Sequence, residues 1–173
     1  MHKKVLSEID LYYGEVITPK GFEINLNKIK NDIIHSYATD KKMSDNPRDY
    51  ASADYKIPFS QPLQWFQDYI RDHWRAEYNF TLITKSVWGN VFDYNQKSFT
   101  RNNVDPVDLR NSPDYTLIYG IDIGEDKENG VVIEYDNNRR KGATWHMPIK
   151  NNHFIMFPST NRYFISPNKS KRL

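Results

Sequence analysis

Hydrophobic positions in the first half of the chain follow a helical period. Residues 26–38 have apolar side chains at spacings of three and four, which predicts a helix with one apolar face, and Asn25 before them is a suitable N-cap. Residues 61–78 repeat this pattern with a broader apolar face, and Ser60 stands in the capping position. The segment between them, residues 39–58, is polar and is predicted to be a long surface loop.

The second half changes to a twofold period, which is typical of β-strands. Val, Ile, Thr and aromatic residues alternate there with polar ones, and turn-forming residues separate the runs. One short strand is also predicted before the first helix, and the stretch after the second helix is expected to form one or two strands. The predicted strands are residues 14–18, 80–94, 115–123, 131–135, 143–149, 153–157 and 161–166.

Two dipeptides predict how neighbouring strands are joined. Asn129-Gly130 favours a tight turn, and Asn151-Asn152 is expected to join the strands on either side of it into a hairpin in which His146 pairs with Phe157. Helices followed by many short strands predict an α+β fold. We expect a β-sandwich or jelly roll with two N-terminal helices packed on one sheet.

Length and composition favour one compact domain. The 173 residues include 38% hydrophobic and 14% aromatic side chains, enough for a core. We therefore expect a single domain over 1–173, with a strand and two helices in 1–79 and the jelly-roll core in 80–173. The absence of cysteine excludes disulfides, thiolate nucleophiles and Cys-bound metals. No apolar run approaches about 18 residues, so no membrane span is expected, and the first residues lack the apolar stretch of a signal peptide.

Common catalytic signatures are absent from the sequence. There is no His-x-Asp, no His-Glu-x-x-His, no phosphate-binding glycine loop and no Gly-x-Ser-x-Gly. His146 and His153 fall on the two strands of the predicted hairpin, but nothing nearby completes a metal site. The loop 100–114 interleaves acidic and basic side chains, which favours an ordered, salt-bridged connection over an acid–base pair.

Two basic clusters, residues 139–141 and 169–172, leave open a binding module for nucleic acid or carbohydrate. Aromatic side chains such as Tyr94, Phe99 and Tyr163 would stack on bases or sugars in such a module. A net charge of only +2 favours the simpler interpretation, in which solvated loop charges lie over an aromatic core.

Four segments of the second half carry a family resemblance. They are Trp88–Phe92, Asp114–Ile121, Asn151–Ser159 with its Phe-Pro-Ser sequence, and Ile165–Asn168. Their order and spacing resemble the 2-oxoglutarate/Fe(II)-dependent oxygenases, in particular the prolyl-hydroxylase-like proteins of tailed phages of cyanobacteria. The resemblance covers roughly residues 80–173 and implies a double-stranded β-helix, or jelly roll.

The same resemblance places the family's iron ligands at residues that differ from it. The His-x-Asp motif would fall near Thr100–Asn103, where there is no histidine, and the distal histidine position is taken by Tyr163. A guanidinium has no lone pair to give, so Arg101 cannot replace a ligand. Arg172 matches the arginine that binds the cosubstrate carboxylate. The implied degenerate pocket or partner contact comprises Arg101, Asn102, Asn103, Asp105, Asp108, Arg110, Tyr163 and Arg172, and we expect Arg101 or Arg110 to pair with a nearby aspartate.

The resemblance without its ligands implies a non-enzymatic phage protein that binds no cofactor. It would act as a virion structural, assembly or protein-interaction subunit, in the virion or the cytoplasm of the infected host. Its partners would be other virion proteins or further copies of itself, reached through the polar loops 39–58, 100–114 and 137–141. The alternative is an active Fe(II)/2-oxoglutarate-dependent dioxygenase with an atypical site drawn from His146, His153, Asp105 or Asp108.

Overall fold

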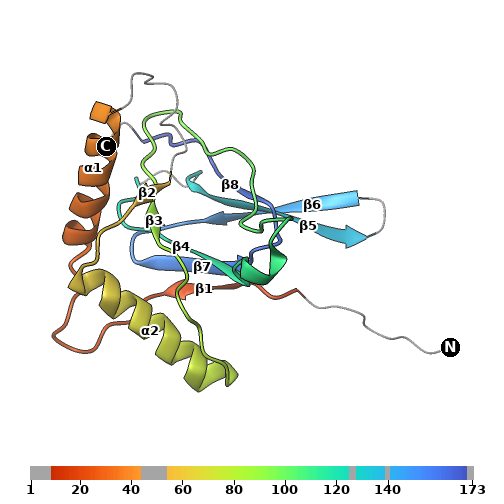
Figure 1. The fold of residues 1–173 in the computed structure, drawn as a ribbon, viewed down its shortest axis with the longest axis horizontal. Helices are drawn as coiled ribbons and strands as arrows, with labels where there is room; N and C mark the ends of the chain where they lie inside the picture. The colour runs from red at the N-terminus through yellow and green to blue at the C-terminus, as the bar shows by residue number, and fades with distance from the viewer. Residues whose placement is uncertain (1–8, 44–53, 125–127, 139–140, 171–173) are drawn as a thin grey trace. The chain divides into compact units, whose positions relative to one another are not determined.

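The computed structural model describes residues 9–43, 54–124, 128–138 and 141–170 (Figure 1). These residues form α-helices, one short 3-10 helix and antiparallel sheets, so the predicted α+β class is confirmed. The helices are α1 (Leu26–Met43), α2 (Gln61–Tyr78) and the 3-10 helix η1 (Leu109–Asn111). The strands are β1 (Tyr12–Glu15), β2 (Tyr55–Lys56), β3 (Trp88–Gly89), β4 (Tyr115–Tyr119), β5 (Gly130–Asn138), β6 (Lys141–Pro148), β7 (His153–Pro158) and β8 (Tyr163–Ile165).

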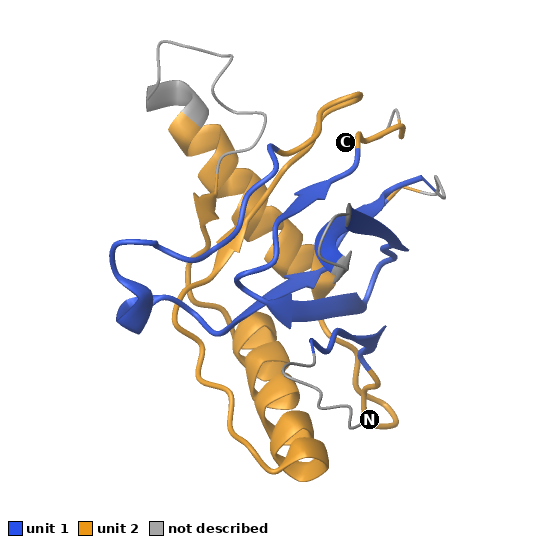
Figure 2. Cartoon of the chain, turned by 90° about the vertical axis from the view of Figure 1, so that its right-hand side faces the viewer, with its two compact units in different colours: residues 1–16, 99–123, 127–166 blue, residues 17–98, 124–126, 167–173 orange. Residues whose placement is uncertain are grey.

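The chain divides into two compact units (Figure 2). Unit 1 consists of residues 1–16, 99–123 and 127–166, and contains β1, η1 and β4 to β8. Unit 2 consists of residues 17–98, 124–126 and 167–173, and contains both α-helices with β2 and β3. A single domain over 1–173 remains a prediction.

Unit 1 is built on two antiparallel three-stranded sheets, ordered β1-β7-β4 and β6-β5-β8. Ile155 and Phe157 of β7 pack against Val131 and Ile133 of β5, and Tyr163 of β8 completes this side of the core. The described strands thus form two sheets over a shared apolar core, without closing into a barrel.

The hairpin predicted around Asn151-Asn152 is wrong. A left-handed turn is present, with φ of 62° at Asn152, but it connects strands of different sheets. β6 pairs with β5, whereas β7 pairs with β1 and β4. His146 therefore lies opposite Val132, not Phe157, and His153 lies opposite Glu15.

The turn predicted at Asn129-Gly130 is also wrong, because Gly130 begins β5 and neither residue has a positive φ. Gly130 is needed for a different reason: a Cβ there would collide with the carbonyl oxygen of Met147 and the ring of His146 on the neighbouring strand. The glycine thus permits close approach of β6 to β5.

In unit 2, α2 has the predicted bounds. Its buried stripe is Phe66, Ile70 and Trp74, and Asn79 ends it in a left-handed conformation with φ of 56°. Ser60 stands at the N-cap, but its side chain makes no capping bond; its carbonyl oxygen accepts from the Gln64 N–H at 2.9 Å. The helix boundary thus rests on backbone geometry and apolar spacing.

Helix α1 begins as predicted, since Asn25 Oδ1 accepts from the Lys28 N–H at 3.0 Å. It ends at Met43, so the prediction of loop for residues 39–43 is wrong. Four of these five residues are polar, but none is glycine or proline, so nothing in the segment prevents the helix from continuing. Residues 44–53 of the predicted loop lie outside the described residues.

The extended strands predicted over residues 80–94 are reduced to β3, which pairs with β2. Gly89 of β3 approaches α1 so closely that a Cβ would lie 2.6 Å from Ile33 Cγ1. Elsewhere in the segment Ile83 is 87% exposed, so its apolar character does not mark a buried strand. The first predicted strand is shifted as well, because β1 occupies residues 12–15 rather than 14–18.

Candidate functional site: a hydrogen-bonded loop with an apolar tip

Residues 99–114 of unit 1 lead into β4, and their first part is fixed to the sheets. Arg101 forms an isolated antiparallel bridge with Tyr163, in which each N–H donates to the other's carbonyl oxygen at 2.9 and 2.8 Å. The Asn103 N–H donates to the Ser159 carbonyl oxygen at 3.1 Å. The loop therefore leaves the sheets from a defined position.

Side chains at this anchor form a partly buried polar group, the Tyr163 cluster, made of Arg101, Asn103, Thr116, Ser159 and Tyr163. The Tyr163 hydroxyl accepts from Arg101 Nε at 3.1 Å and from Asn103 Nδ2 at 3.2 Å. Asn103 Nδ2 also donates to Thr116 Oγ1 at 2.9 Å, and Thr116 Oγ1 lies 2.9 Å from Ser159 Oγ. Tyr163 is only 2% exposed, so these bonds replace solvation that the hydroxyl has lost.

Phe157 and Arg101 both contact the Tyr163 ring. Phe157 meets it edge-on with ring centres 5.1 Å apart, and the guanidinium carbon of Arg101 lies 5.7 Å from its centre. A cation at that distance from an aromatic ring is attracted by the ring's negative face. Burial also excludes Tyr163 from the stacking role that a nucleic-acid or carbohydrate module would need.

The Tyr163 cluster occupies the position at which the resemblance places iron. The two segments that the resemblance brings together, 100–103 and Tyr163, do meet in unit 1. The donor set does not suit Fe(II), because it consists of a cation, amide N–H groups and neutral hydroxyls, whereas iron requires imidazole or carboxylate ligands. We therefore derive no chemical step through iron.

Beyond the anchor, the loop is ordered by its own acidic residues. Asp105 Oδ1 accepts from the Val107 N–H at 2.9 Å. Asp108 caps η1 and its Oδ2 accepts from Asn111 Nδ2 at 2.7 Å. Ser112 Oγ accepts from the Asp105 N–H at 2.8 Å and lies 3.1 Å from the Asp108 carbonyl oxygen, so the two ends of the turn are joined.

The ion pair that we expected between Arg101 or Arg110 and a nearby aspartate stays a prediction. Asp105 and Asp108 serve backbone and amide groups of their own loop, while Arg101 Nε donates to Tyr163. Arg110 lies in η1 on the exposed surface, and Asn102 is exposed beside the anchor. Arg172 lies outside the described residues.

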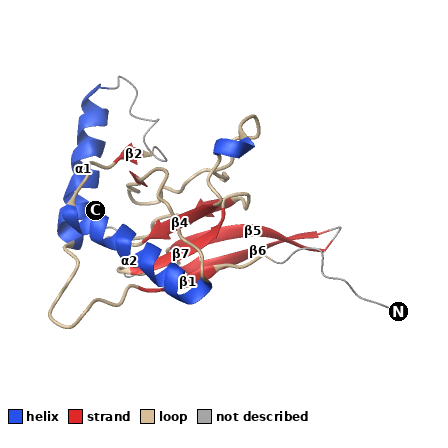
Figure 3. Ribbon diagram, turned by 60° about the horizontal axis from the view of Figure 1, so that its bottom comes forward, coloured by secondary structure: helices blue, strands red, loops and turns tan. Residues whose placement is uncertain are grey.

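The loop presents apolar side chains to solvent. We call residues 105–112 the interaction loop; within it, Val107 is 93% exposed and Leu109 is 67% exposed. Figure 3 shows the short helix η1 on a loop that stands away from the strands of unit 1. A loop whose polar groups are satisfied internally, with its apolar groups outside, is suited to contact with another macromolecule.

Sequence patterns missed several of these residues. Thr116 lies in a predicted strand and Ser159 between two predicted strands, with no sign in the sequence of a shared polar contact. Val107 and Leu109 had a signal, since they are the aliphatic residues between Asp105 and Asn111, but the interleaved charges drew attention instead.

The residues considered for an atypical dioxygenase site are not assembled into one. His146 Nε2 lies 3.2 Å from the Glu128 carbonyl oxygen, and His153 Nδ1 lies 2.9 Å from the Asn151 carbonyl oxygen, on strands of different sheets. Within the part of the chain that the structure describes, no three His, Asp or Glu side chains lie close enough together to hold a metal ion.

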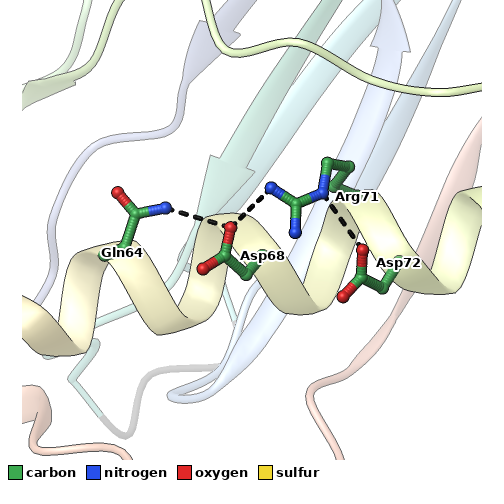
Figure 4. A network of polar contacts seen from close by, with 4 residues as sticks. All are labelled: Gln64, Asp68, Arg71 and Asp72. Carbon is green, nitrogen blue, oxygen red and sulfur yellow. Dashed lines mark hydrogen bonds and ion pairs between the residues drawn. The ribbon is translucent and has the colours of Figure 1, made fainter.

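A second polar group lies on α2 of unit 2 (Figure 4). Asp68 Oδ1 accepts from Gln64 Nε2 at 3.0 Å and from Arg71 Nη1 at 2.7 Å, and Arg71 Nε donates to Asp72 at 3.0 Å. The carboxylate of Asp72 raises the pKa of Arg71 above its ordinary value, and the carboxylate of Asp68 adds a smaller effect in the same direction. Side chains three or four residues apart, such as Asp68 with Arg71 and with Gln64, stabilise the exposed face of a helix, so we assign the group a structural role.

No protein-family model matches the chain, and no curated protein matches it either. None of the helices in the described residues has the length and apolar character needed to cross a bilayer.

Proposed function

We propose that the chain is a non-catalytic protein-interaction subunit on an oxygenase-like jelly-roll fold, and that it serves in the structure or assembly of a phage virion. The observation that carries the proposal is the interaction loop, which holds Val107 and Leu109 in solvent on a hydrogen-bonded frame.

The energetics of such a loop favour binding. Exposed aliphatic side chains gain free energy when a partner covers them, at roughly 25 cal/mol for each Å² of apolar surface. A loop that is already ordered by Asp105, Asp108 and Ser112 loses less conformational entropy on association than a flexible one. The burial of apolar surface and the small loss of conformational entropy both favour association.

The Tyr163 cluster supports the non-catalytic part of the proposal. The cluster offers a guanidinium, a side-chain amide and three hydroxyls, whereas the resemblance requires imidazole and carboxylate. The two antiparallel sheets over a shared core are compatible with a jelly roll. The phage and virion assignments rest on the resemblance of residues 80–173.

The experiment measures how much of the chain is incorporated into phage particles. Infected cells that produce the chain would be supplied with tagged wild type or with Val107→Asp/Leu109→Asp, and the tag would be quantified in purified particles. Ile83→Asp is the matched control, because Ile83 is equally apolar and also exposed but lies in unit 2.

Wild type and the control are expected in the particles, with at least about a fivefold loss for the double variant, which corresponds to about 1 kcal/mol of binding free energy. Absence of the wild type from particles would overturn the virion role. Equal incorporation of all three chains would overturn the role of the interaction loop.

A further inference from the structure

Strand β6 is an edge strand of unit 1 with one side open. It pairs along its length with β5, and within the described residues no strand pairs with its other side. β5 and β6 form the longest strand pair among the described residues, and Figure 1 shows both strands extending side by side. An open edge is a row of backbone donors and acceptors ready to pair with another strand.

The register identifies which backbone groups are open. Glu134 N–H donates to the Arg162 carbonyl oxygen, on the β8 side, so even-numbered residues of β5 face β8 and odd-numbered ones face β6. Ile133 and Tyr135 lie opposite Trp145 and Ala143, which therefore bond to β5. The N–H and C=O groups of the alternate residues in β6 point outward: Gly142, Thr144 and His146, each an exposed residue.

The usual protection of an edge is confined here to the two ends of β6, Lys141 and Pro148. Natural edge strands carry charged side chains such as Lys, or Pro, or a bulge that twists the edge away. Residues 142–147 of β6 are Gly-Ala-Thr-Trp-His-Met, and the register irregularity lies at the hairpin end, between Asp136 and Asn138 of β5. The central part of this edge is therefore regular and free of permanent charge.

We infer that β6 pairs with β6 of a second copy of this chain, antiparallel, around a two-fold axis at Thr144. Thr144 then faces its own counterpart, Gly142 faces the partner's His146, and Ala143 faces the partner's Trp145. Each large side chain meets a small one, and all outward N–H and C=O groups of Gly142, Thr144 and His146 find a partner. An axis at His146 would instead set Thr144 against Pro148, which has no N–H to donate.

The exposed indole of Trp145 on this edge also favours a second copy of the chain as the partner. Trp145 remains 38% exposed although its ring contacts Tyr13 of β1, with ring centres 5.9 Å apart. Pairing around Thr144 sets the small side chain of the partner's Ala143 beside each Trp145 and so covers part of the exposed ring. The inference deepens the proposed function by naming one partner, but it uses a strand that the interaction loop does not include.

The test is sedimentation velocity of the full chain over a range of concentrations. Wild type is expected to form a dimer. Thr144→Pro removes the outward N–H but no bond to β5, so the fold tolerates it and the dimer is lost. Thr144→Val keeps the N–H, the size and the β-propensity, and is expected to dimerise like wild type.

Amide hydrogen exchange of the wild type tests the same inference if Thr144→Pro fails to fold. In wild type, the amides of Gly142, Thr144 and His146 should become protected as concentration rises, while those of Ala143 and Trp145 are protected throughout. A monomer at every concentration, a longer polymer series, or a dimer that survives Thr144→Pro would each overturn the inference. Val107→Asp/Leu109→Asp should leave the dimer intact, so a failure of the loop proposal is distinguishable from a failure of this one.

Discussion

Arg101 Nε donates a hydrogen bond to the hydroxyl of Tyr163, 62 positions later in the chain, and the two backbones also bond to each other. Arg101 is thus held to Tyr163 by both a side-chain bond and backbone bonds. The interaction loop begins four residues after Arg101, so the position of its apolar tip depends on this pair.

Tyr163→Phe should destabilise unit 1. The substitution removes the acceptor of Arg101 and Asn103 without creating a cavity, and an unsatisfied buried donor costs about 1–3 kcal/mol. Urea denaturation measures the change in the free energy of unfolding. Tyr13→Phe, at an exposed position, is the control and should change stability by less than about 0.5 kcal/mol. A Tyr163→Phe effect as small as the control would mean that the hydroxyl contacts contribute nothing.

Gly130→Ala should be destabilising by about 1–3 kcal/mol, because the added Cβ meets the Met147 carbonyl oxygen and the His146 ring. Gly142→Ala is matched to it on the facing strand, where the nearest atom, Asp136 Oδ1, would be at an ordinary 3.6 Å. Thermal unfolding of both variants is the measurement. If the two glycine variants melt alike, close approach of β6 does not explain Gly130.

Asp108→Ala should loosen the interaction loop without unfolding unit 1. The carboxylate accepts from the Asn111 N–H and side-chain amide, and loss of such a cap costs about 0.5–2 kcal/mol locally. Exchange of the Asn111 amide proton should accelerate several-fold, whereas amides of β5 should not change. Arg110→Ala, on the exposed side of η1, is expected to leave both rates as they are. Unchanged exchange at Asn111 in the Asp108 variant would contradict the assigned cap.

Alkaline pH should destabilise unit 1 partly through Tyr119. Burial raises the pKa of its hydroxyl, which donates to Asn152 Oδ1 at 2.7 Å. A raised folded-state pKa means that the folded chain holds this proton more tightly than the unfolded chain. The contribution is therefore complete below about pH 10 and is lost as the pH rises above it. Unfolding free energies at rising pH should fall less steeply for Tyr119→Phe than for wild type, with Tyr13→Phe following wild type.

Iron should bind to the chain well below one equivalent, and 2-oxoglutarate should not be converted to succinate and carbon dioxide. The reason is the guanidinium of Arg101 within the Tyr163 cluster, where a second cation is disfavoured. Anaerobic incubation with Fe(II), followed by metal analysis and succinate assay, makes the measurement. One bound iron per chain with turnover would refute the non-catalytic proposal.

Local sequence patterns predicted α2 to the residue, from its apolar spacing and from Ser60, which stands at the N-cap position. They did not predict which strands pair. β6 and β7 are adjacent in sequence and separated by a turn-forming dipeptide, yet each belongs to a different sheet. A twofold pattern marks a strand and its buried face, but partner choice depends on contacts between distant segments.

For the candidate site too, one part was predicted from the sequence and another part was not. The resemblance brought the Arg101 segment beside Tyr163, and the structure has that contact. It gave no indication that Thr116 and Ser159 would complete the group, since each is one hydroxyl in an otherwise ordinary strand end. Exposure of Val107 and Leu109 depends on how Asp105 and Asp108 turn the backbone, which no periodicity records.

The anchoring of the loop by Tyr163 has a consequence during synthesis. A growing chain produces Val107 and Leu109 well before the ribosome reaches residue 163, and contacts of such long sequence separation form late in folding. Until then the two aliphatic side chains have no fixed place from which to engage anything. The ordered tip therefore distinguishes a finished molecule from an unfinished one, and an assembling partner that selects it takes up only chains whose sheets are already complete.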